Sequence, residues 1–227
     1  MRLEGKVALI TAAGGALGTA IALRFAREGA VVVLNDVVST HLDRVVAEIA
    51  EEEGGKALIA LGDVSRPAHV ERMLREALDA FGHVDIVVNN ATPAMDVDGV
   101  LEGAALCASA VLPGMRARKA GRVINTGPAD TLGSAAAVPA GLIALTTKLA
   151  IECARDGITV NCVVPGVTAE ARLTFDAAAK TLVPLIPMGR IGDPREVAAA
   201  HVFFASDEAA YVTGQVLYVD GGLSVSG

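Results

Sequence analysis

Short runs of β-branched and aliphatic residues alternate with segments of helical periodicity along the whole chain. The runs lie at residues 7–11, 30–35, 57–61, 84–89, 122–126, 158–164 and 215–219. Each run is continuous enough for a strand that is buried on both faces. Between the runs, apolar residues recur every three or four positions, as in Leu42, Val45, Val46 and Ile49, and in Val70, Met73, Leu74, Ala77, Leu78 and Phe81. This spacing places each set on one face of a helix.

The alternation predicts the fold class. Strands that are separated by helices pair in parallel through right-handed crossovers, with helices on both faces of the sheet. We therefore expect an α/β fold with a three-layer, doubly wound, Rossmann-type parallel sheet of about seven strands. No linker or charge block interrupts residues 1–227, which predicts a single domain. Ligands of such sheets bind beyond the carboxyl ends of the strands, so functional residues are expected just after each run.

Charge and hydropathy argue against two kinds of partner. The net charge of −7 is spread over interleaved acidic and basic residues, without the basic stripe that nucleic-acid binding requires. No segment approaches the roughly 20 consecutive apolar residues of a membrane span. The uncharged run 7–23 follows Arg2 and Lys6 like a signal peptide, but glycines interrupt it and it continues as a helical pattern. We expect a cytoplasmic protein that binds neither nucleic acid nor membrane.

The three cysteines, Cys107, Cys153 and Cys162, stand far apart and form no Cys-x-x-Cys pair. Neither a metal site nor a thiol-exchange motif is therefore predicted. Buried free thiols in a reducing compartment are the better interpretation.

The residues that follow the runs form an ordered series of motifs. In chain order they are Thr11-Ala12-Ala13-Gly14-Gly15-Ala16-Leu17-Gly18, Asn35-Asp36, Asp63-Val64, Asn89-Asn90-Ala91, Pro165-Gly166, Pro187-Met188-Gly189-Arg190-Ile191-Gly192-Asp193-Pro194, Tyr211-Val212-Thr213-Gly214 and Val219-Asp220-Gly221-Gly222. This series resembles the short-chain dehydrogenase/reductase family over nearly the whole chain. The resemblance implies the Rossmann-type fold and a nicotinamide dinucleotide as the ancestral cofactor.

The cofactor site that the resemblance implies is only partly retained. The matching residues are Thr11, Gly14, Gly15, Gly18, Asp36, Asp63, Val64 and Asn90. Asp36 stands where an acidic side chain holds the adenosine ribose and disfavours the extra phosphate of NADP, which favours NAD. Ala12 and Ala16 replace two family glycines, so NAD binding is expected to be weak or lost. The structural alternatives are a solvated strand-end role for Asp36 and strand-end caps for Asp63 and Asn90.

The resemblance also implies a catalytic tyrosine, a lysine four residues later, a serine and an asparagine. The aligned positions hold Ala135, Pro139, Pro128 and Val100, respectively, so we predict no catalytic residue. The family threonine that reaches the nicotinamide aligns with Glu170, and Thr168 lies close by. Thr126, Asp130, Thr131 and Ser134 are polar residues near these positions, without a lysine or histidine close in sequence to activate them.

Three hypotheses of function follow. The first is a non-catalytic subunit that forms a hetero-oligomer, as a heterotetramer, with an active NAD-dependent relative. The resemblance suggests one such complex, the hydroxyacyl-CoA dehydrogenase of benzylsuccinate oxidation in aromatic degradation. A small apolar surface at Ala104, Ala105, Ala108, Ala110 and Val111 suits such an interface, with core packing as the alternative. The second is an enzyme with a remodelled site: a lyase, an isomerase or an atypical NAD-dependent oxidoreductase. The third is a regulatory nucleotide binder.

Overall fold

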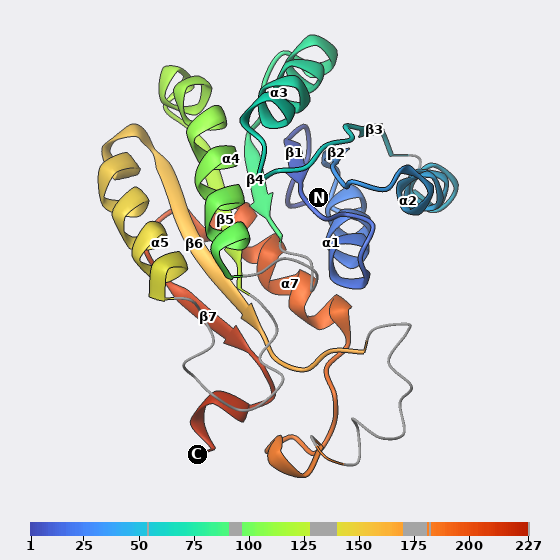
Figure 1. Cartoon of the computed structure of the whole chain (residues 1–227), viewed down its shortest axis with the longest axis vertical. Coiled ribbons are helices and arrows are strands. Elements are labelled where there is room, and N and C mark those ends of the chain that lie inside the picture. The colour runs from blue at the N-terminus through green and yellow to red at the C-terminus, as the bar shows by residue number, and fades with distance from the viewer. Residues whose placement is uncertain (54, 91–96, 128–139, 170–180, 182, 227) are drawn as a thin grey trace.

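The computed structural model describes residues 1–53, 55–90, 97–127, 140–169, 181 and 183–226. Seven strands form one sheet: β1 (Val7–Ile10), β2 (Val31–Leu34), β3 (Ala57–Ile59), β4 (Ile86–Asn89), β5 (Gly121–Thr126), β6 (Ile158–Pro165) and β7 (Val216–Val219). Their order is β3-β2-β1-β4-β5-β6-β7, and all neighbours pair in parallel (Figure 1). The predicted fold class is confirmed.

Helices cover both faces of the sheet. They are α1 (Ala16–Arg27), α2 (Ser39–Glu53), α3 (Pro67–Phe81), α4 (Val97–Arg118), α5 (Ala140–Cys153) and α7 (Pro194–Ala205). Helix α1 packs against α2 and α7 on one face, whereas α4 packs against α3 and α5 on the other. The chain therefore forms the predicted three layers, with the sheet between two layers of helices (Figure 1).

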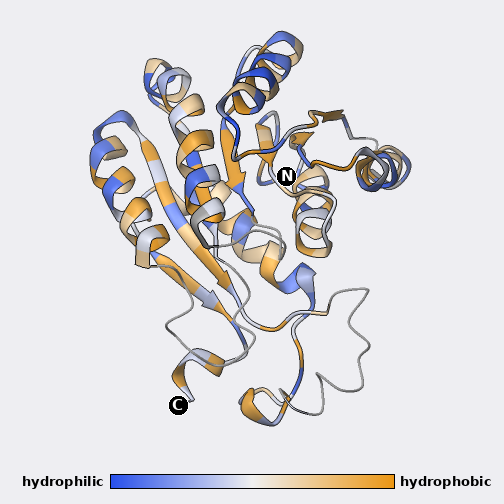
Figure 2. Cartoon of the chain, viewed as in Figure 1, coloured by the Kyte–Doolittle hydropathy of each residue, from blue (hydrophilic) through white to orange (hydrophobic). Residues whose placement is uncertain are grey.

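Strand β1 shows how the sheet supports two apolar cores. Ala8 and Ile10 pack into the core under α1 and α7, while Val7 and Leu9 point to the core under α3 and α4. Successive side chains of a strand point to opposite faces, so a strand between two helical layers has to be apolar throughout. Figure 2 shows the result: hydrophobic strands in the interior and hydrophilic residues along the outer sides of the helices.

One expectation about burial was wrong. Strands β3 and β7 are not buried on both faces, because they lie at the two edges of the sheet and are only partly covered. On the predicted apolar face of α3, Val70, Met73 and Ala77 are buried, whereas Leu78 is 40% exposed.

The small apolar residues of α4 belong mainly to the core. Ala104, Ala108 and Val111 are each at most 4% exposed and pack against the sheet and neighbouring helices. Core packing therefore explains these three better than the predicted subunit interface. The same helix contains an apolar stretch, 99–118, that is long enough to cross a membrane. Of the most apolar 18 residues in this stretch, 44% are buried inside the fold. Such a stretch is typical of a core helix as well.

The strand order reverses direction between β1 and β4. The chain moves outward from β1 through β2 to β3, then crosses back to β4 and continues outward to β7. Connections leave β1 and β4 toward opposite faces at such a switch point, which opens a crevice beyond their carboxyl ends. Thr11 follows β1 directly and Asn90 follows β4, so two of the predicted site residues meet there.

Candidate functional site

The loop between β1 and α1 keeps the backbone shape of a glycine loop although Ala12 occupies it. Ala12 has φ of +48°, in the left-handed region that L side chains rarely adopt. Its carbonyl oxygen accepts a hydrogen bond from Gly15 N at 3.3 Å. A β-carbon on Gly18 would overlap that carbonyl oxygen and lie 2.7 Å from Ala13 Cα, so only glycine fits there. The alanine is therefore accommodated in a strained backbone conformation.

This strain leads to a first prediction. We expect Ala12→Gly to raise the free energy of unfolding by about 1 kcal/mol, because glycine adopts positive φ without the steric cost of a methyl group. It should also tighten dinucleotide binding, since the same methyl group stands in the loop. Chemical denaturation and cofactor titration measure the two effects. Lys119, with φ of +55° just after α4, is the control for binding: Lys119→Gly relieves similar strain, removes the ion pair with Asp156 and should leave cofactor binding unchanged. Equal binding by wild type and Ala12→Gly would contradict the prediction.

The carboxylate of Asp36, just after β2, is hydrogen-bonded to this loop. Its Oδ2 accepts a hydrogen bond from Gly14 N at 3.0 Å, and its Oδ1 accepts one from Val37 N at 2.7 Å. A β-carbon on Gly14 would lie 2.9 Å from Asp36 Oδ2 and 2.7 Å from His41 Cβ, so the glycine permits this close approach. Asp36 is 8% exposed and is therefore not a solvated strand-end residue.

Asn90 and Thr11 join the ends of β4 and β1. The Thr11 hydroxyl donates to the Asn90 carbonyl oxygen at 2.8 Å and accepts from Asn90 N at 2.9 Å. Asn90 Nδ2 also donates to the carbonyl oxygen of Ala12 at 3.3 Å. Both side chains are buried. Their observed contacts agree with the capping alternative and hold the loop at the switch point.

Asp63 has a similar structural role at the end of β3. Its Oδ1 accepts hydrogen bonds from the hydroxyl of Ser65 at 2.7 Å and from Ser65 N at 3.0 Å. The Ser65 hydroxyl is the main cause that lowers the pKa of Asp63. Asp63 N in turn donates to His69 Nδ1 at 3.1 Å. Val64, the next residue, is half-buried and packs against the core under α3 and α4.

These residues fit a dinucleotide. Gly14 and Gly18 let the loop pack closely against Asp36 and the start of α1, which begins at Ala16. A helix N-terminus with free N–H groups suits a pyrophosphate, and a carboxylate at the next strand end suits ribose hydroxyls. Asp36 supplies that carboxylate. Among the described residues, no three histidine, cysteine or carboxylate side chains gather as a metal site would need.

The predicted positions of the family catalytic residues are only partly visible. Val100 lies in α4, is 7% exposed and packs against Ala104 and Leu142. Pro128, Ala135 and Pro139 lie outside the described residues, as do Asp130, Thr131, Ser134 and Glu170. The absence of a catalytic side chain at these positions thus stays a prediction from the sequence. The side chain of Lys148 is 69% exposed, and its Nζ lies 3.9 Å from Glu152 Oε1.

The cysteines are buried and free, as predicted. Burial raises the pKa of Cys107 to about 12, and burial likewise raises the pKa of Cys162 to about 12. Both thiols therefore stay protonated at neutral pH. Since only a thiolate is an effective nucleophile, neither cysteine is a candidate nucleophile.

A buried histidine next to β5 was not anticipated. Thr126 ends β5, and its Oγ1 lies 3.0 Å from Nε2 of His201 in α7. Nδ1 of His201 lies 3.0 Å from the carbonyl oxygen of Val197, so Nδ1 carries the proton and Nε2 accepts from Thr126. Burial lowers the pKa of His201 to about 4. The available signal was a histidine within the apolar run 197–205 of this helix.

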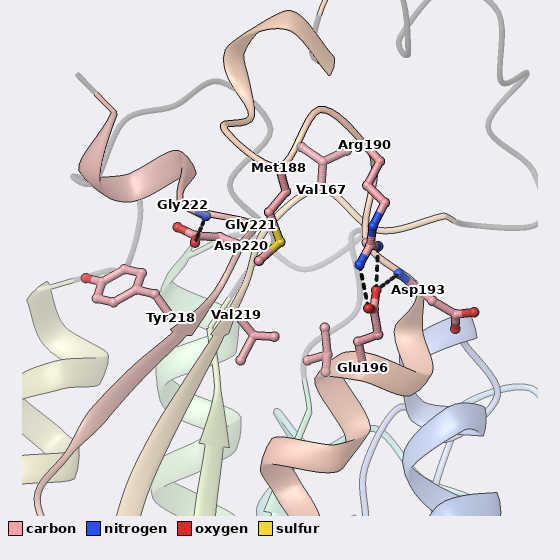
Figure 3. Close-up of a pocket in the computed structure, with 12 residues that line it drawn as sticks. Val167, Met188, Arg190, Asp193, Glu196, Tyr218, Val219, Asp220, Gly221 and Gly222 are labelled. Carbon is pink, nitrogen blue, oxygen red and sulfur yellow. Dashed lines mark hydrogen bonds and ion pairs between the residues drawn. The ribbon is translucent and has the colours of Figure 1, made fainter.

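A cavity lies beyond the carboxyl ends of β6 and β7 (Figure 3). Its volume is about 350 Å³, and its apolar lining comes from Val167, Met188, Val197, Tyr218 and Val219. Four charged residues also line the cavity. Arg190 donates to both carboxylate oxygens of Glu196 at 2.8 and 2.7 Å, whereas the Asp220 carboxylate accepts from Gly222 N and Ser224 N. The Arg190 hydrogen bond is the main cause that lowers the pKa of Glu196 to about 2. The cavity therefore combines an apolar surface with the carboxylate of Asp220.

A seven-stranded parallel sheet in this order, with a glycine loop after β1 and an acidic residue after β2, is the arrangement of a Rossmann-type α/β fold. A family model described as enoyl-(acyl carrier protein) reductase matches residues 12–224. The chain belongs to the short-chain dehydrogenase/reductase family.

Relatives match the chain from end to end. It is 37% identical to the (2S)-[(R)-hydroxy(phenyl)methyl]succinyl-CoA dehydrogenase subunit BbsD of Thauera aromatica, over 99% of both chains. It is also 37% identical to the 3-oxoacyl-[acyl-carrier-protein] reductase FabG of Vibrio cholerae, over 98% of this chain and 99% of that one. The crystal structure of levodione reductase superposes with a TM-score of 0.87, at 32% identity, and covers 98% of this chain and 99% of the other.

These relatives correct the leading functional hypothesis. A non-catalytic subunit was expected, yet the matching proteins are named as a dehydrogenase subunit and as reductases. The expectation of a pseudoenzyme was wrong because it weighed four aligned positions above the similarity of the whole chain to oxidoreductases. The comparisons point to an oxidoreductase.

Proposed function

We propose that the protein is an atypical oxidoreductase of the short-chain dehydrogenase/reductase class that uses NAD(H) in the cytoplasm. Bound NAD(H) supplies or accepts a hydride. The observation that carries the proposal is the buried carboxylate of Asp36, which faces the N–H of Gly14 beside the N-terminus of α1. A negative charge at this point suits the two ribose hydroxyls of NAD and repels the additional phosphate of NADP.

Coenzyme preference tests this proposal. We expect the wild-type chain to bind NADH more tightly than NADPH in a fluorescence titration. Asp36→Asn should weaken NADH binding by about tenfold, because a hydrogen bond to a charged group contributes roughly 1.5 kcal/mol, and should narrow the gap to NADPH. Asp63→Asn is the comparison variant: Asp63 also accepts local hydrogen bonds, from Ser65, but it follows β3 and does not contact the loop before α1, so its NADH binding should change less. Preference for NADPH in the wild type would overturn the assignment.

Proton transfer in this enzyme runs through a group other than the family tyrosine. This part rests on the aligned Ala135 and Pro139, neither of which exchanges a proton. Loss of one acid or base group commonly slows an enzyme by about 10²–10⁴-fold. We therefore expect steady turnover slower than that of a tyrosine-containing relative by about that factor, with NADH oxidation followed at 340 nm. Turnover equal to that of such a relative would contradict this part.

The substrate is proposed to be a hydroxyacyl or oxoacyl thioester. Two features support this class: the names of the relatives include a [hydroxy(phenyl)methyl]succinyl-CoA dehydrogenase subunit and 3-oxoacyl-[acyl-carrier-protein] reductases, and apolar side chains line part of the 350 Å³ cavity beyond β6 and β7. An apolar cavity of this size suits an acyl chain or a phenyl group. A panel of 3-hydroxyacyl-CoA esters with NAD⁺ tests the class, and simple secondary alcohols are the comparison. Faster oxidation of the simple alcohols would contradict it.

We also propose that the protein assembles with an active short-chain dehydrogenase of different sequence, as a heterotetramer. Two features favour an assembly: a relative is named as a subunit, and large apolar side chains are exposed near one sheet edge, among them Tyr211 and Leu217. Native mass spectrometry after co-expression with a neighbouring short-chain dehydrogenase is the test. A complex with equal numbers of both chains is expected, whereas separate homo-oligomers would contradict the proposal.

A further inference from the structure

Three buried polar side chains form one hydrogen-bonded chain beneath the carboxyl ends of β4 and β5. Asn89 Nδ2 donates to Asn125 Oδ1 at 2.9 Å, and Asn125 Nδ2 donates to Thr146 Oγ1 at 2.9 Å. The Thr146 hydroxyl donates to the carbonyl oxygen of Leu142 at 2.8 Å. The three side chains belong to residues that are 6%, 0% and 0% exposed. Every donor in this chain points from β4 toward α5.

The direction of the chain fixes the orientation of the Asn89 amide. Asn89 Nδ2 also donates to the carbonyl oxygen of Ala104 at 3.3 Å, so two acceptors face the nitrogen and an inverted amide would meet neither. Asn89 Oδ1 therefore points the other way. Among the described residues it has no hydrogen-bond partner, although it is buried. Buried carbonyl oxygens nearly always have a partner, which indicates that a hydrogen-bond donor from outside the described residues binds here.

Asn89 lines a small cavity at the switch point, together with Thr11, Asn90, Val64, Val100 and Ala104. The volume of the cavity is about 10 Å³, which is the size that holds one water molecule. Its wall has a second acceptor, because the hydroxyl oxygen of Thr11 keeps one lone pair free after accepting from Asn90 N. An anion has no hydrogen to offer these acceptors, and an organic ligand does not fit.

We propose that this cavity binds one ordered water molecule, which donates one hydrogen to Asn89 Oδ1 and the other to Thr11 Oγ1. The water then connects the loop that Thr11 and Asn90 hold to the hydrogen-bonded chain that runs from Asn89 to α5. Its first hydrogen bond completes the alignment of donors from the cavity to Leu142, and aligned hydrogen bonds strengthen one another.

A crystal structure of the full chain at a resolution that shows ordered water tests the proposal directly. We expect one peak of electron density in the cavity, at hydrogen-bonding distance from Asn89 Oδ1 and Thr11 Oγ1. A dry cavity would overturn the proposal. A side chain or backbone N–H that donates to Asn89 Oδ1 would overturn it as well.

Two variants separate the role of the acceptor from that of the space. Val64→Ala removes apolar wall and keeps both acceptors, so the water should remain. Asn89→Leu removes the acceptor within a similar volume, so the water should be lost. Retention of the water in crystals of Asn89→Leu would contradict its assignment to Asn89. If Asn89→Leu does not fold, the wild-type and Val64→Ala densities decide. The presence or loss of the water density does not depend on whether the chain binds the proposed coenzyme. Dinucleotide binding is measured separately, by titration.

Discussion

Replacement of Gly18 by alanine is expected to lower the free energy of unfolding by roughly 3 kcal/mol and to abolish dinucleotide binding. The reason is contact with the backbone: the added methyl group would overlap the carbonyl oxygen of Ala12 and lie 2.7 Å from Ala13 Cα and 2.9 Å from the carbonyl carbon of Ala12. Backbone atoms cannot rotate away as a flexible side chain does, so the loop has to move off the helix. Chemical denaturation followed by circular dichroism measures the loss of stability.

Gly15 provides the matched control for this substitution. It belongs to the same loop, and a β-carbon there would lie 3.6 Å from the Ala12 carbonyl oxygen, which is ordinary contact. Gly15→Ala should therefore change the free energy of unfolding by less than about 1 kcal/mol. Equal losses for the two variants would show that the loop is sensitive to any methyl group rather than to the helix contact at Gly18.

The stability of the protein is expected to fall by about 3 kcal/mol as the pH drops from 6.5 to 4 because of His201. The pKa of this histidine is lowered to about 4 by burial, whereas the unfolded value is near 6.5. Between pH 6.5 and pH 4, His201 is protonated in the unfolded chain and neutral in the folded chain, so proton binding favours unfolding. The contribution is fully present above pH 6.5, and its loss is complete below pH 4. Urea denaturation at several pH values measures this slope.

Two substitutions distinguish His201 from other titrating groups. His201→Gln should flatten the pH dependence over this range, because glutamine does not titrate and still reaches polar partners. Thr126→Val removes the hydroxyl that donates to His201 Nε2 but keeps the imidazole. It should lower stability at every pH and leave the slope in place. A slope that persists unchanged in His201→Gln would assign the effect to other residues.

The alternating apolar runs were sufficient to predict the sheet, because a strand between two helical layers is apolar on both faces. The runs that became β1 and β4 illustrate this. The edge strands were beyond this reasoning: the run at 215–219 is as apolar as the others, yet β7 has a neighbour on one side only. Position in the sheet depends on the order of the crossovers, which local periodicity does not contain.

The candidate site was predicted in outline and missed in its interior. The strand-end motifs located Thr11, Asp36 and Asn90 correctly, beyond the carboxyl ends of the neighbouring strands β1, β2 and β4. The link from Asn89 through Asn125 to Thr146 was not predicted, because its partners are up to 36 residues apart and meet only after the strands pair. Polar residues inside apolar runs were the available signal. The catalytic prediction for Val100, Pro128, Ala135 and Pro139 came from alignment to the family and not from physical constraints on these residues.

Hydride transfer by the purified chain is the most direct test of the proposed function. The chain is incubated in stoichiometric amount with NADH deuterated at C4, each stereoisomer in turn, and a 3-oxoacyl-CoA ester, and the product is analysed by mass spectrometry. This measurement detects even a single slow turnover. The account predicts deuterium in the 3-hydroxyacyl product from one of the two stereoisomers. Unlabelled substrate after prolonged incubation, under conditions in which a 3-oxoacyl-(acyl-carrier-protein) reductase labels the same ester, would contradict it.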